Sequence, residues 1–146
     1  MNDSLDGSVT IVSGLSGSGK SVALRTLEDL GYYCVDNLPA NLLPALVANI
    51  DKHDARRSKI AVSIDVRNMT NDLSLIGQLL SQVNQAGFST RLAFFDTEDA
   101  VLIKRFSDTR RRHPLSMDGL ALSDAIARER KQLRPLAALA DTVIDT

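Results

Sequence analysis

The sequence has one cysteine, no long apolar run and almost no net charge. Because Cys34 is alone, no internal disulfide can form, which favours a reducing cytoplasm. No stretch approaches the roughly 18 apolar residues of a membrane helix, and the polar start does not resemble a signal peptide. We therefore predict a cytoplasmic protein without a membrane partner. The net charge of −1 also excludes a global attraction to nucleic acid.

What is present is the composition of one globular domain. The chain has 146 residues, of which 44% are hydrophobic, and this is enough for a single core. Strand-like and helix-like runs alternate, with strands expected at 9–13, 32–35, 59–66, 91–95 and 142–145, and helices at 20–30, 39–51, 72–86, 98–111 and 122–139. This alternation predicts an α/β fold with a five-stranded parallel sheet between helices on both faces. Pro135 predicts a kink or a second short helix in the last helical segment.

The most specific motif follows the first strand. It fits G-x-x-x-x-G-K-[ST], the phosphate-binding loop or Walker A motif, with the residues Gly14, Leu15, Ser16, Gly17, Ser18, Gly19, Lys20 and Ser21. In such a loop, backbone N–H groups surround a phosphate chain and the next helix adds the positive end of its dipole. Lys20 is then expected along the β- and γ-phosphates, and the Ser21 hydroxyl on Mg²⁺. We predict a kinase-like P-loop NTPase domain of three layers that binds a nucleotide. If the domain is catalytic, Lys20 is expected to be one of its catalytic residues.

Magnesium at this loop also needs an acidic residue from a neighbouring strand. Asp65 and Asp96 each follow an apolar strand, and both strands flank the first one in the usual order of P-loop kinases, so topology does not choose. We favour Asp65 as metal ligand and catalytic residue. The reason is that its segment, Asp65, Val66, Arg67 and Asn68, adds two further polar side chains that could contact a nucleotide. The guanidinium of Arg67 suits a phosphate, and the amide of Asn68 suits a base, a sugar or a water. A loop with an Asx turn is the alternative interpretation.

A basic cluster follows the fourth strand, with the residues Lys104, Arg105, Arg110, Arg111, Arg112 and His113. P-loop kinases often carry arginines on a mobile lid that closes on the transferred phosphate. Arg105, Arg110 and Arg111 are candidates for that role. A solvated basic face and contact with an RNA backbone are the alternatives, although no interleaved aromatic residue is present to stack bases.

Three other residues carry weaker signals. Asp36 and Asn37 follow the second strand, where they could touch an acceptor substrate, but helix capping explains them equally well. Cys34 lies within a strand and is better explained as a small core residue than as a reactive thiol. The guanine-reading string N-K-x-D is absent, so the sequence does not reveal the base.

Several segments together resemble one protein family. They are residues 14–25, 33–39, 62–68 and 105–115, which contain the strings Cys-Val-Asp-Asn-Leu-Pro, Asp-Val-Arg-Asn and Thr-Arg-Arg-Arg-His-Pro-Leu. The chain is similar to the N-terminal nucleotide-binding domain of the bacterial RapZ/YvcJ family of RNase adapter proteins. The resemblance runs from about residue 9 to the end, and the three strings are much more specific than the phosphate loop alone.

The resemblance implies a cytoplasmic bacterial protein that binds ATP and GTP and hydrolyses them weakly. The ATP segment falls on residues 14–21 and the GTP segment on residues 65–68. It also implies a partner small RNA, an endoribonuclease and control of amino-sugar synthesis. Residues 1–8 are then interpreted as an extension and residues 9–146 as the nucleotide-binding domain. A C-terminal domain is expected but absent, and a homo-oligomer could form through such missing regions.

Three functions follow from these observations. The first is a regulatory ATP- or GTP-binding domain with slow or no hydrolysis, because the complete phosphate loop has no clear catalytic base. The second is a small-molecule kinase with the region from Arg105 to Arg111 as its lid. The third is an RNA-binding or protein-docking module in which the nucleotide is only structural.

Overall fold

A five-stranded parallel sheet forms the centre of the domain. The computed structural model describes residues 7–50, 59–64, 76–109, 113 and 121–146. The strands are β1 (Gly7–Gly14), β2 (Tyr33–Leu38), β3 (Lys59–Ile64), β4 (Phe88–Asp96) and β5 (Thr142–Asp145). They are hydrogen-bonded in the order β2-β3-β1-β4-β5. The predicted parallel sheet is therefore confirmed, with β3 and β4 on either side of β1.

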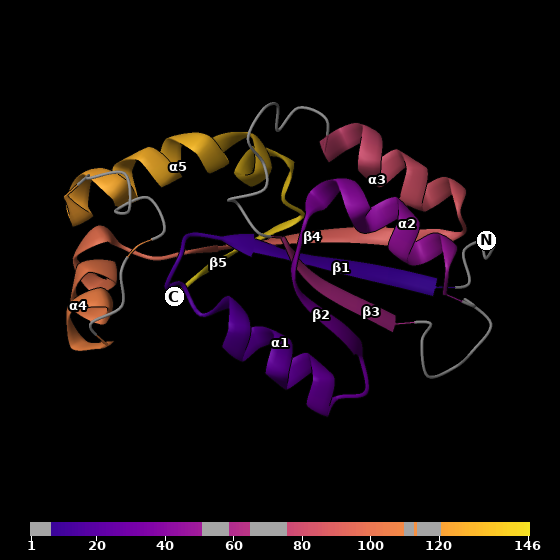
Figure 1. Cartoon of the computed structure of the whole chain (residues 1–146), viewed down its shortest axis with the longest axis horizontal. Coiled ribbons are helices and arrows are strands. Elements are labelled where there is room, and N and C mark those ends of the chain that lie inside the picture. The colour runs from indigo at the N-terminus through magenta and orange to yellow at the C-terminus, as the bar shows by residue number, and fades with distance from the viewer. Residues whose placement is uncertain (1–6, 51–58, 65–75, 110–112, 114–120) are drawn as a thin grey trace.

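Helices cover both faces of this sheet (Figure 1). They are α1 (Lys20–Asp29), the short 3₁₀ helix η1 (Ala40–Leu42), α2 (Leu43–Ala48), α3 (Ile76–Gln85), α4 (Asp99–Thr109) and α5 (Leu122–Leu139). Helix α1 lies on one face, and α2, α3 and α5 lie on the other. Helix α4 packs beside α5 at the end of the sheet that also holds the C-terminus. Among the described helices, none is both long and apolar enough to cross a bilayer.

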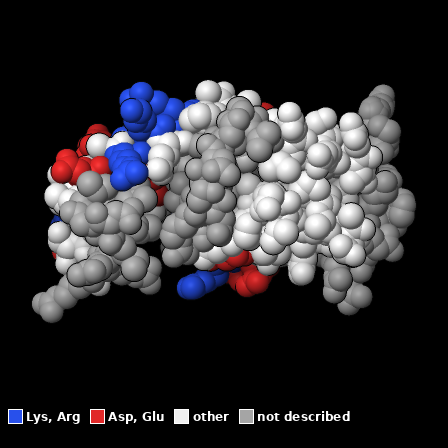
Figure 2. Space-filling view, turned by 45° about the horizontal axis from the view of Figure 1, so that its top comes forward, with Lys and Arg blue, Asp and Glu red and all other residues white. Residues whose placement is uncertain are grey.

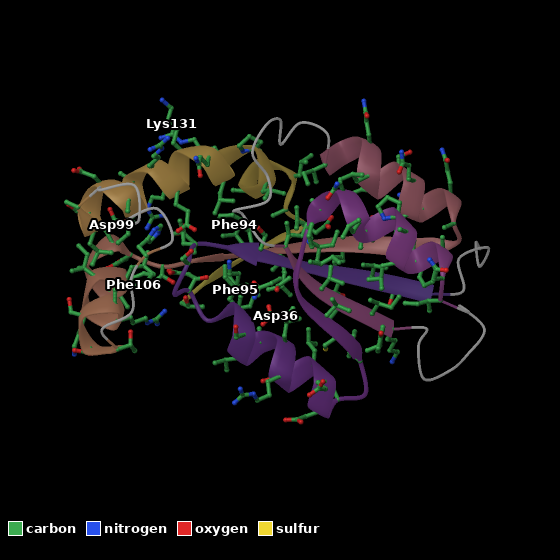
Figure 3. All side chains as sticks on the ribbon, viewed as in Figure 1. Asp36, Phe94, Phe95, Asp99, Phe106 and Lys131 are labelled. Carbon is green, nitrogen blue, oxygen red and sulfur yellow. The ribbon has the colours of Figure 1, made fainter. Side chains whose placement is uncertain are left out.

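Alternation along the strands divides the core into two layers. Phe94 and Phe95 are neighbours on β4 and point to opposite faces (Figure 3). Phe94 belongs to the larger cluster, under α2, α3 and α5, and Phe95 packs with Leu24 of α1 in the smaller one. The central strands are apolar on both faces because helices cover them on both sides.

Two predicted elements differ from the structure. The helix expected at 39–51 is a 3₁₀ turn followed by only six α-helical residues, ending at Ala48. The last helix continues through Pro135 to Leu139, so the prediction of a second short helix is wrong. Leu133 and Leu136 are both 1% exposed, so core packing on each side of Pro135 opposes the break that proline favours.

A candidate phosphate-binding site

The phosphate loop connects the end of β1 to the start of α1, as the motif predicts. Helix α1 begins at Lys20, and its N-cap is Gly19, with a φ of 101° and no side chain to cap the helix. The first N–H groups of an α-helix have no partner within the helix. At the same end of α1, Lys20 Nζ donates a hydrogen bond of 3.0 Å to the Gly14 carbonyl. Backbone donors and an ammonium group therefore lie close together, which suits an anion.

Two glycines let the loop approach its neighbours closely. A Cβ on Gly14 would lie 2.3 Å from the backbone oxygen of Phe95, and the φ of Gly14 is 145°. The same Phe95 oxygen accepts the N–H of Leu15 at 3.3 Å. A Cβ on Gly17 would lie 3.1 Å from the ring of Phe106 in α4. Glycine at these positions keeps the loop against β4 and α4.

Helix α4 also sends an arginine to the loop. Arg105 Nη1 donates a 2.9 Å hydrogen bond to the Gly17 carbonyl. Of the three predicted lid arginines, Arg105 is thus beside the loop, whereas Arg110 and Arg111 lie outside the described residues. The predicted segment at residues 65–68 also lies outside them.

A buried carboxylate from α5 holds the other side of the loop. Glu129 Oε1 accepts the Ser16 N–H at 2.9 Å, and Glu129 Oε2 accepts the Ser16 hydroxyl at 2.6 Å. His113 Nε2 lies 2.9 Å from Glu129 Oε1, and the side chains of His113 and Glu129 are fully buried. We call Ser16, Glu129 and His113 the loop anchor.

Hydrogen bonding decides the ionisation of this carboxylate. Burial alone would raise the pKa of Glu129, but hydrogen bonds from His113 and from the Ser16 hydroxyl and amide outweigh it and lower that pKa. The side chain is therefore an ionised acceptor, and His113 Nε2 must be the donor of the bond between them.

We predict a pH-dependent advantage of the wild type over Glu129→Gln. Because the pKa of Glu129 is lowered in the folded state, its ionisation stabilises the fold above the ordinary value of 4.5, and that contribution is lost as the pH falls through the lowered value. The difference in free energy of unfolding between the two proteins should therefore shrink as the pH falls below about 5.

Urea titrations at a series of pH values from neutral to strongly acidic measure this difference. The exposed Glu98→Gln is the control for a change in net charge. If the difference between the wild type and Glu129→Gln stays constant into strong acid, the carboxylate does not stabilise the fold through its charge, and the prediction is wrong.

An open cavity of about 500 Å³ adjoins the loop. Its walls are residues 17–19 of the loop, Val22 and Ala23 of α1, Phe95, Arg105 and Thr146. The hydroxyl of Thr146, the residue after β5, donates a hydrogen bond of 3.0 Å to the Ser18 carbonyl of the loop. In the described part of the chain, the buried Ser18 Oγ has no hydrogen-bond partner. The cavity has a size that fits a small ligand.

A smaller cleft of about 200 Å³ lies beside α1. Ser21 lines it together with Leu24, Arg25, Glu28, Cys34 and Asp36. In Figure 3, Asp36 lies between the sheet and α1. Its carboxylate accepts a hydrogen bond from the hydroxyl of Ser63 on β3. The cleft thus places a carboxylate near the hydroxyl that the motif assigns to Mg²⁺.

The alternative metal acid, Asp96, is bound by other groups. Its Oδ1 accepts Arg130 Nη1 at 2.7 Å and the N–H of Thr97 at 2.8 Å. Among the described residues, no group of three or more His, Cys, Asp or Glu side chains could hold a metal. Mg²⁺ is usually held by one or two protein groups together with phosphate oxygens and water, and Ser21 is the described residue that the motif assigns to it.

Cys34 is partly buried: it packs against the smaller core cluster and also lines the cleft beside α1. Its thiol donates to the Leu24 carbonyl at 3.3 Å and packs beside α1. Burial, with a smaller contribution from Glu28, raises the pKa of this thiol. A raised pKa lowers the fraction of the reactive thiolate.

Glu129 is a residue of the site that no sequence motif marks. One signal is present, because Ile126, Glu129 and Leu133 share one face of α5 at helical spacing. An acid on an otherwise apolar stripe indicates a buried carboxylate with a partner. The partner itself is not predictable, because His113 belongs to a basic cluster in the sequence but is 1% exposed in the structure.

Charged side chains are unevenly distributed over the surface. Figure 2 shows Lys and Arg gathered toward one end of the molecule, together with acidic side chains, while much of the described surface toward the other end is uncharged. Lys131 of α5 lies at the outer surface of this charged end (Figure 3). The mixture of signs does not by itself favour a polyanion such as RNA.

Comparison with known proteins finds relatives over nearly the whole chain. The model of the RapZ-like N-terminal domain matches residues 8–146. A nucleotide-binding protein of Stenotrophomonas maltophilia is 56% identical over 140 residues, which cover 93% of this chain and 47% of that protein. A nucleotide-binding protein of Cellvibrio japonicus is 50% identical over 138 residues, which cover 94% of this chain and 46% of that one. The chain thus spans about half the length of these relatives.

Solved structures with the same fold include two kinases. Shikimate kinase from Bacteroides thetaiotaomicron has a TM-score of 0.59 at 14% identity, over 94% of this chain and 86% of the kinase. A gluconokinase from Sinorhizobium meliloti has a TM-score of 0.56 at 20% identity, over 97% of this chain and 83% of the kinase. At these identities the likeness establishes the fold alone, and it confirms the predicted P-loop kinase-like architecture.

Proposed function

The chain belongs to the RapZ-like N-terminal domain family, and on that premise we propose that it is a regulatory domain that binds ATP or GTP with Mg²⁺ and hydrolyses it slowly or not at all. The observation that carries this proposal is the phosphate loop at the start of α1. There the uncapped first turn of the helix and the ammonium of Lys20 lie together. The loop follows the carboxyl end of β1, where ligands of open α/β sheets bind. The names of its relatives, which are nucleotide-binding proteins, support the same function.

The two cavities beside the loop suggest how a nucleotide would lie. The larger one, with Phe95, Arg105 and Thr146 in its walls, has room for a base and sugar next to the loop. The smaller cleft holds Ser21, the proposed Mg²⁺ ligand. When bound, the ion supplies positive charge to the phosphates. Asp65 is still the proposed acidic ligand and catalytic residue, because Asp96 is already paired with Arg130.

Calorimetric titration of the chain with ATP and GTP, with Mg²⁺ and with EDTA, tests the proposal. Adenosine and guanosine are the matched controls, since they share the base and sugar and lack the phosphates that the loop should bind. We expect binding of at least one nucleotide, much weaker binding of its nucleoside, and little phosphate release. If neither nucleotide binds at millimolar concentration, the proposal is wrong.

Ser21→Ala should weaken the response to Mg²⁺ more than nucleotide binding itself. The substitution removes the hydroxyl proposed for the metal and leaves the backbone N–H groups and Lys20 in place. The measured quantity is the ratio of nucleotide affinities with Mg²⁺ and with EDTA, which should fall toward one. Thr26→Ala is the matched control, because Thr26 is a hydroxyl residue farther along α1 that bonds to the Val22 carbonyl.

An unchanged ratio in Ser21→Ala would contradict the metal assignment. The same measurement on Asp65→Asn tests whether that acid assists the ion. If Asp65→Asn keeps the full response to Mg²⁺, Asp96 becomes the better candidate.

A small-molecule kinase is the second candidate function. The specific observation in its favour is the cleft that joins Ser21 to Asp36, because an acceptor hydroxyl could lie there beside the metal. Arg105 at the loop would supply a positive charge toward the transferred phosphate. Screening nucleosides, sugars and sugar phosphates for ATP-dependent phosphorylation separates the two functions. Rapid turnover of one acceptor favours the kinase.

For the whole protein we propose the role that the family resemblance implies. It would present a small RNA to an endoribonuclease and so adjust amino-sugar synthesis in a bacterial cytoplasm. This chain would contribute the nucleotide-dependent part. Charge reversal of Arg110, Arg111 and Arg112 tests whether this chain also touches RNA. An RNA affinity that is unchanged by the reversal counts against such a contact.

A further inference from the structure

We propose that Glu129 is a positioning residue of the phosphate loop, that it holds the first half of the loop in the shape that binds phosphate, and that His113 keeps Glu129 in place. This inference rests on the proposed function, because it concerns nucleotide binding at the same loop. Glu129 reaches the loop from α5 through two hydrogen bonds to one residue, Ser16. Both the backbone and the side chain of Ser16 are therefore fixed by a single carboxylate.

The loop anchor acts at the point where the loop leaves the sheet. Ser16 lies between the end of β1 and the start of α1. The residue between Ser16 and the strand, Leu15, is completely buried. On the other side of Ser16, the carbonyl of Gly17 accepts a hydrogen bond from Arg105. Ser16 and Gly17 are thus held from two different helices, and the rest of the loop leads from them into α1.

His113 completes the hydrogen bonding of the carboxylate. Its Nε2 donates to Glu129 Oε1, the same oxygen that accepts the Ser16 N–H. Its ring also lies 5.3 Å from the ring of Phe106, measured between centroids, and Phe106 packs against Gly17. The histidine therefore connects Glu129 to the helix that touches the next residue of the loop.

The order of these groups excludes a nucleophile triad. In a Ser–His–acid triad the imidazole lies between the hydroxyl and the carboxylate and removes the hydroxyl proton. Here the carboxylate lies between Ser16 and His113, so the imidazole is not the base for the Ser16 hydroxyl. The arrangement suits holding a loop rather than activating a nucleophile.

Removing the charge of Glu129 while keeping its shape separates a positioning role of this side chain from an electrostatic one. A carboxylate close to an anion site disfavours phosphate, so its negative charge cannot be what helps binding. A glutamine side chain has nearly the same shape, its carbonyl oxygen still accepts the Ser16 N–H, and its amide can donate to the Ser16 hydroxyl. If Glu129 acts by geometry, Glu129→Gln should keep nucleotide affinity while Glu129→Ala should lose it.

The experiment measures ATP and GTP affinity by calorimetry for the wild type, Glu129→Ala and Glu129→Gln, and free energies of unfolding for the same proteins. We expect Glu129→Ala to lose roughly tenfold or more in affinity, as a buried donor is left without its acceptor. Glu129→Gln should bind as tightly as the wild type or more tightly. Leu133→Ala is the matched control, because it removes a buried side chain one turn farther along α5 and none of the loop contacts.

Three results would overturn the inference. They are wild-type affinity in Glu129→Ala, an equal loss in Glu129→Gln, and an equal loss in Leu133→Ala. If the wild type binds neither nucleotide, both the proposed function and this inference fail. If the wild type binds a nucleotide and Glu129→Ala binds it with the same affinity, only this inference fails.

Hydrogen exchange decides the case in which Glu129→Ala does not fold. The Ser16 amide proton should be protected in the wild type and in Glu129→Gln, because both offer it an acceptor. Protection in both proteins, with wild-type affinity in Glu129→Gln, supports the inference. A Ser16 amide that exchanges in the wild type as fast as in an open chain overturns it.

Discussion

Replacing Gly14 by alanine is expected to destabilise the domain by roughly 3–5 kcal/mol and to abolish nucleotide binding. The added Cβ would lie 2.3 Å from the carbonyl oxygen of Phe95 and 2.9 Å from its Cβ and its nitrogen. These atoms belong mostly to the backbone of β4, so rotating a side chain cannot relieve the collision. Relief requires β1 and β4 to separate where the loop begins.

Backbone conformation adds to the collision at Gly14. Its φ of 145° is one that residues with a Cβ rarely adopt. Moving Gly14 also moves its carbonyl, which accepts the hydrogen bond from Lys20 Nζ. The substitution therefore disturbs the loop itself and not only the strand that precedes it, and for this reason we expect binding and stability to fail together.

A series of three glycines separates these effects. Gly19 has a φ of 101°, but a Cβ there would have no described heavy atom within 4 Å, so Gly19→Ala should cost only the backbone strain, about 1–3 kcal/mol. Gly77 in α3 has similar open space among the described residues and no unusual φ, so Gly77→Ala should be neutral or stabilise by up to about 1 kcal/mol. Urea unfolding of the three variants measures the expected order. A Gly14→Ala protein as stable as Gly19→Ala would show that the strand ends give way easily.

The architecture was predictable because its signals are local. Strands buried on both faces are continuous apolar runs, and the phosphate loop has fixed residues at fixed spacing. The element order then leads to a parallel sheet, and the structure has one. The loop residues from Gly14 to Ser21 lie together because they are contiguous in sequence.

The contacts that surround the loop were not predictable in the same way. Glu129 is 113 residues from Ser16, and no local pattern pairs them. In the sequence Asp96 is an acid at a strand end without an evident partner, but Arg130 of α5 binds it. Arg105 was predicted near the phosphates as part of a lid, and the structure places it on a carbonyl of the loop. Long-range pairing of charged side chains depends on how helices pack, which the spacing of residues in one helix does not encode.

Lys20→Ala is expected to reduce nucleotide affinity by roughly 10- to 150-fold, which corresponds to about 1.5–3 kcal/mol for a hydrogen bond to a charged group. The reason is that Lys20 supplies a positive charge at the start of α1, and its Nζ lies 3.0 Å from the Gly14 carbonyl across the loop. Polyphosphate beside these groups would gain a charge-assisted contact that neutral N–H groups do not provide. Calorimetry with ATP and GTP measures the loss, and the unfolding free energy should change much less than the affinity.

Lys59→Ala is the matched control for this loss. It removes the same charge from the first residue of β3, at the opposite end of the sheet from the loop, where it pairs in register with Ser8. If affinity falls equally in both variants, net charge rather than a local contact attracts the nucleotide. If Lys20→Ala binds ATP and GTP as the wild type does, the ammonium does not contact the phosphates.

The salt dependence of binding separates the two ways in which Lys20 could act, because an ammonium that contacts phosphate adds an attraction that salt screens. Lys20→Ala should therefore bind with a weaker salt dependence than the wild type, whereas a lower affinity with the same salt dependence would mean that Lys20 acts by shaping the loop.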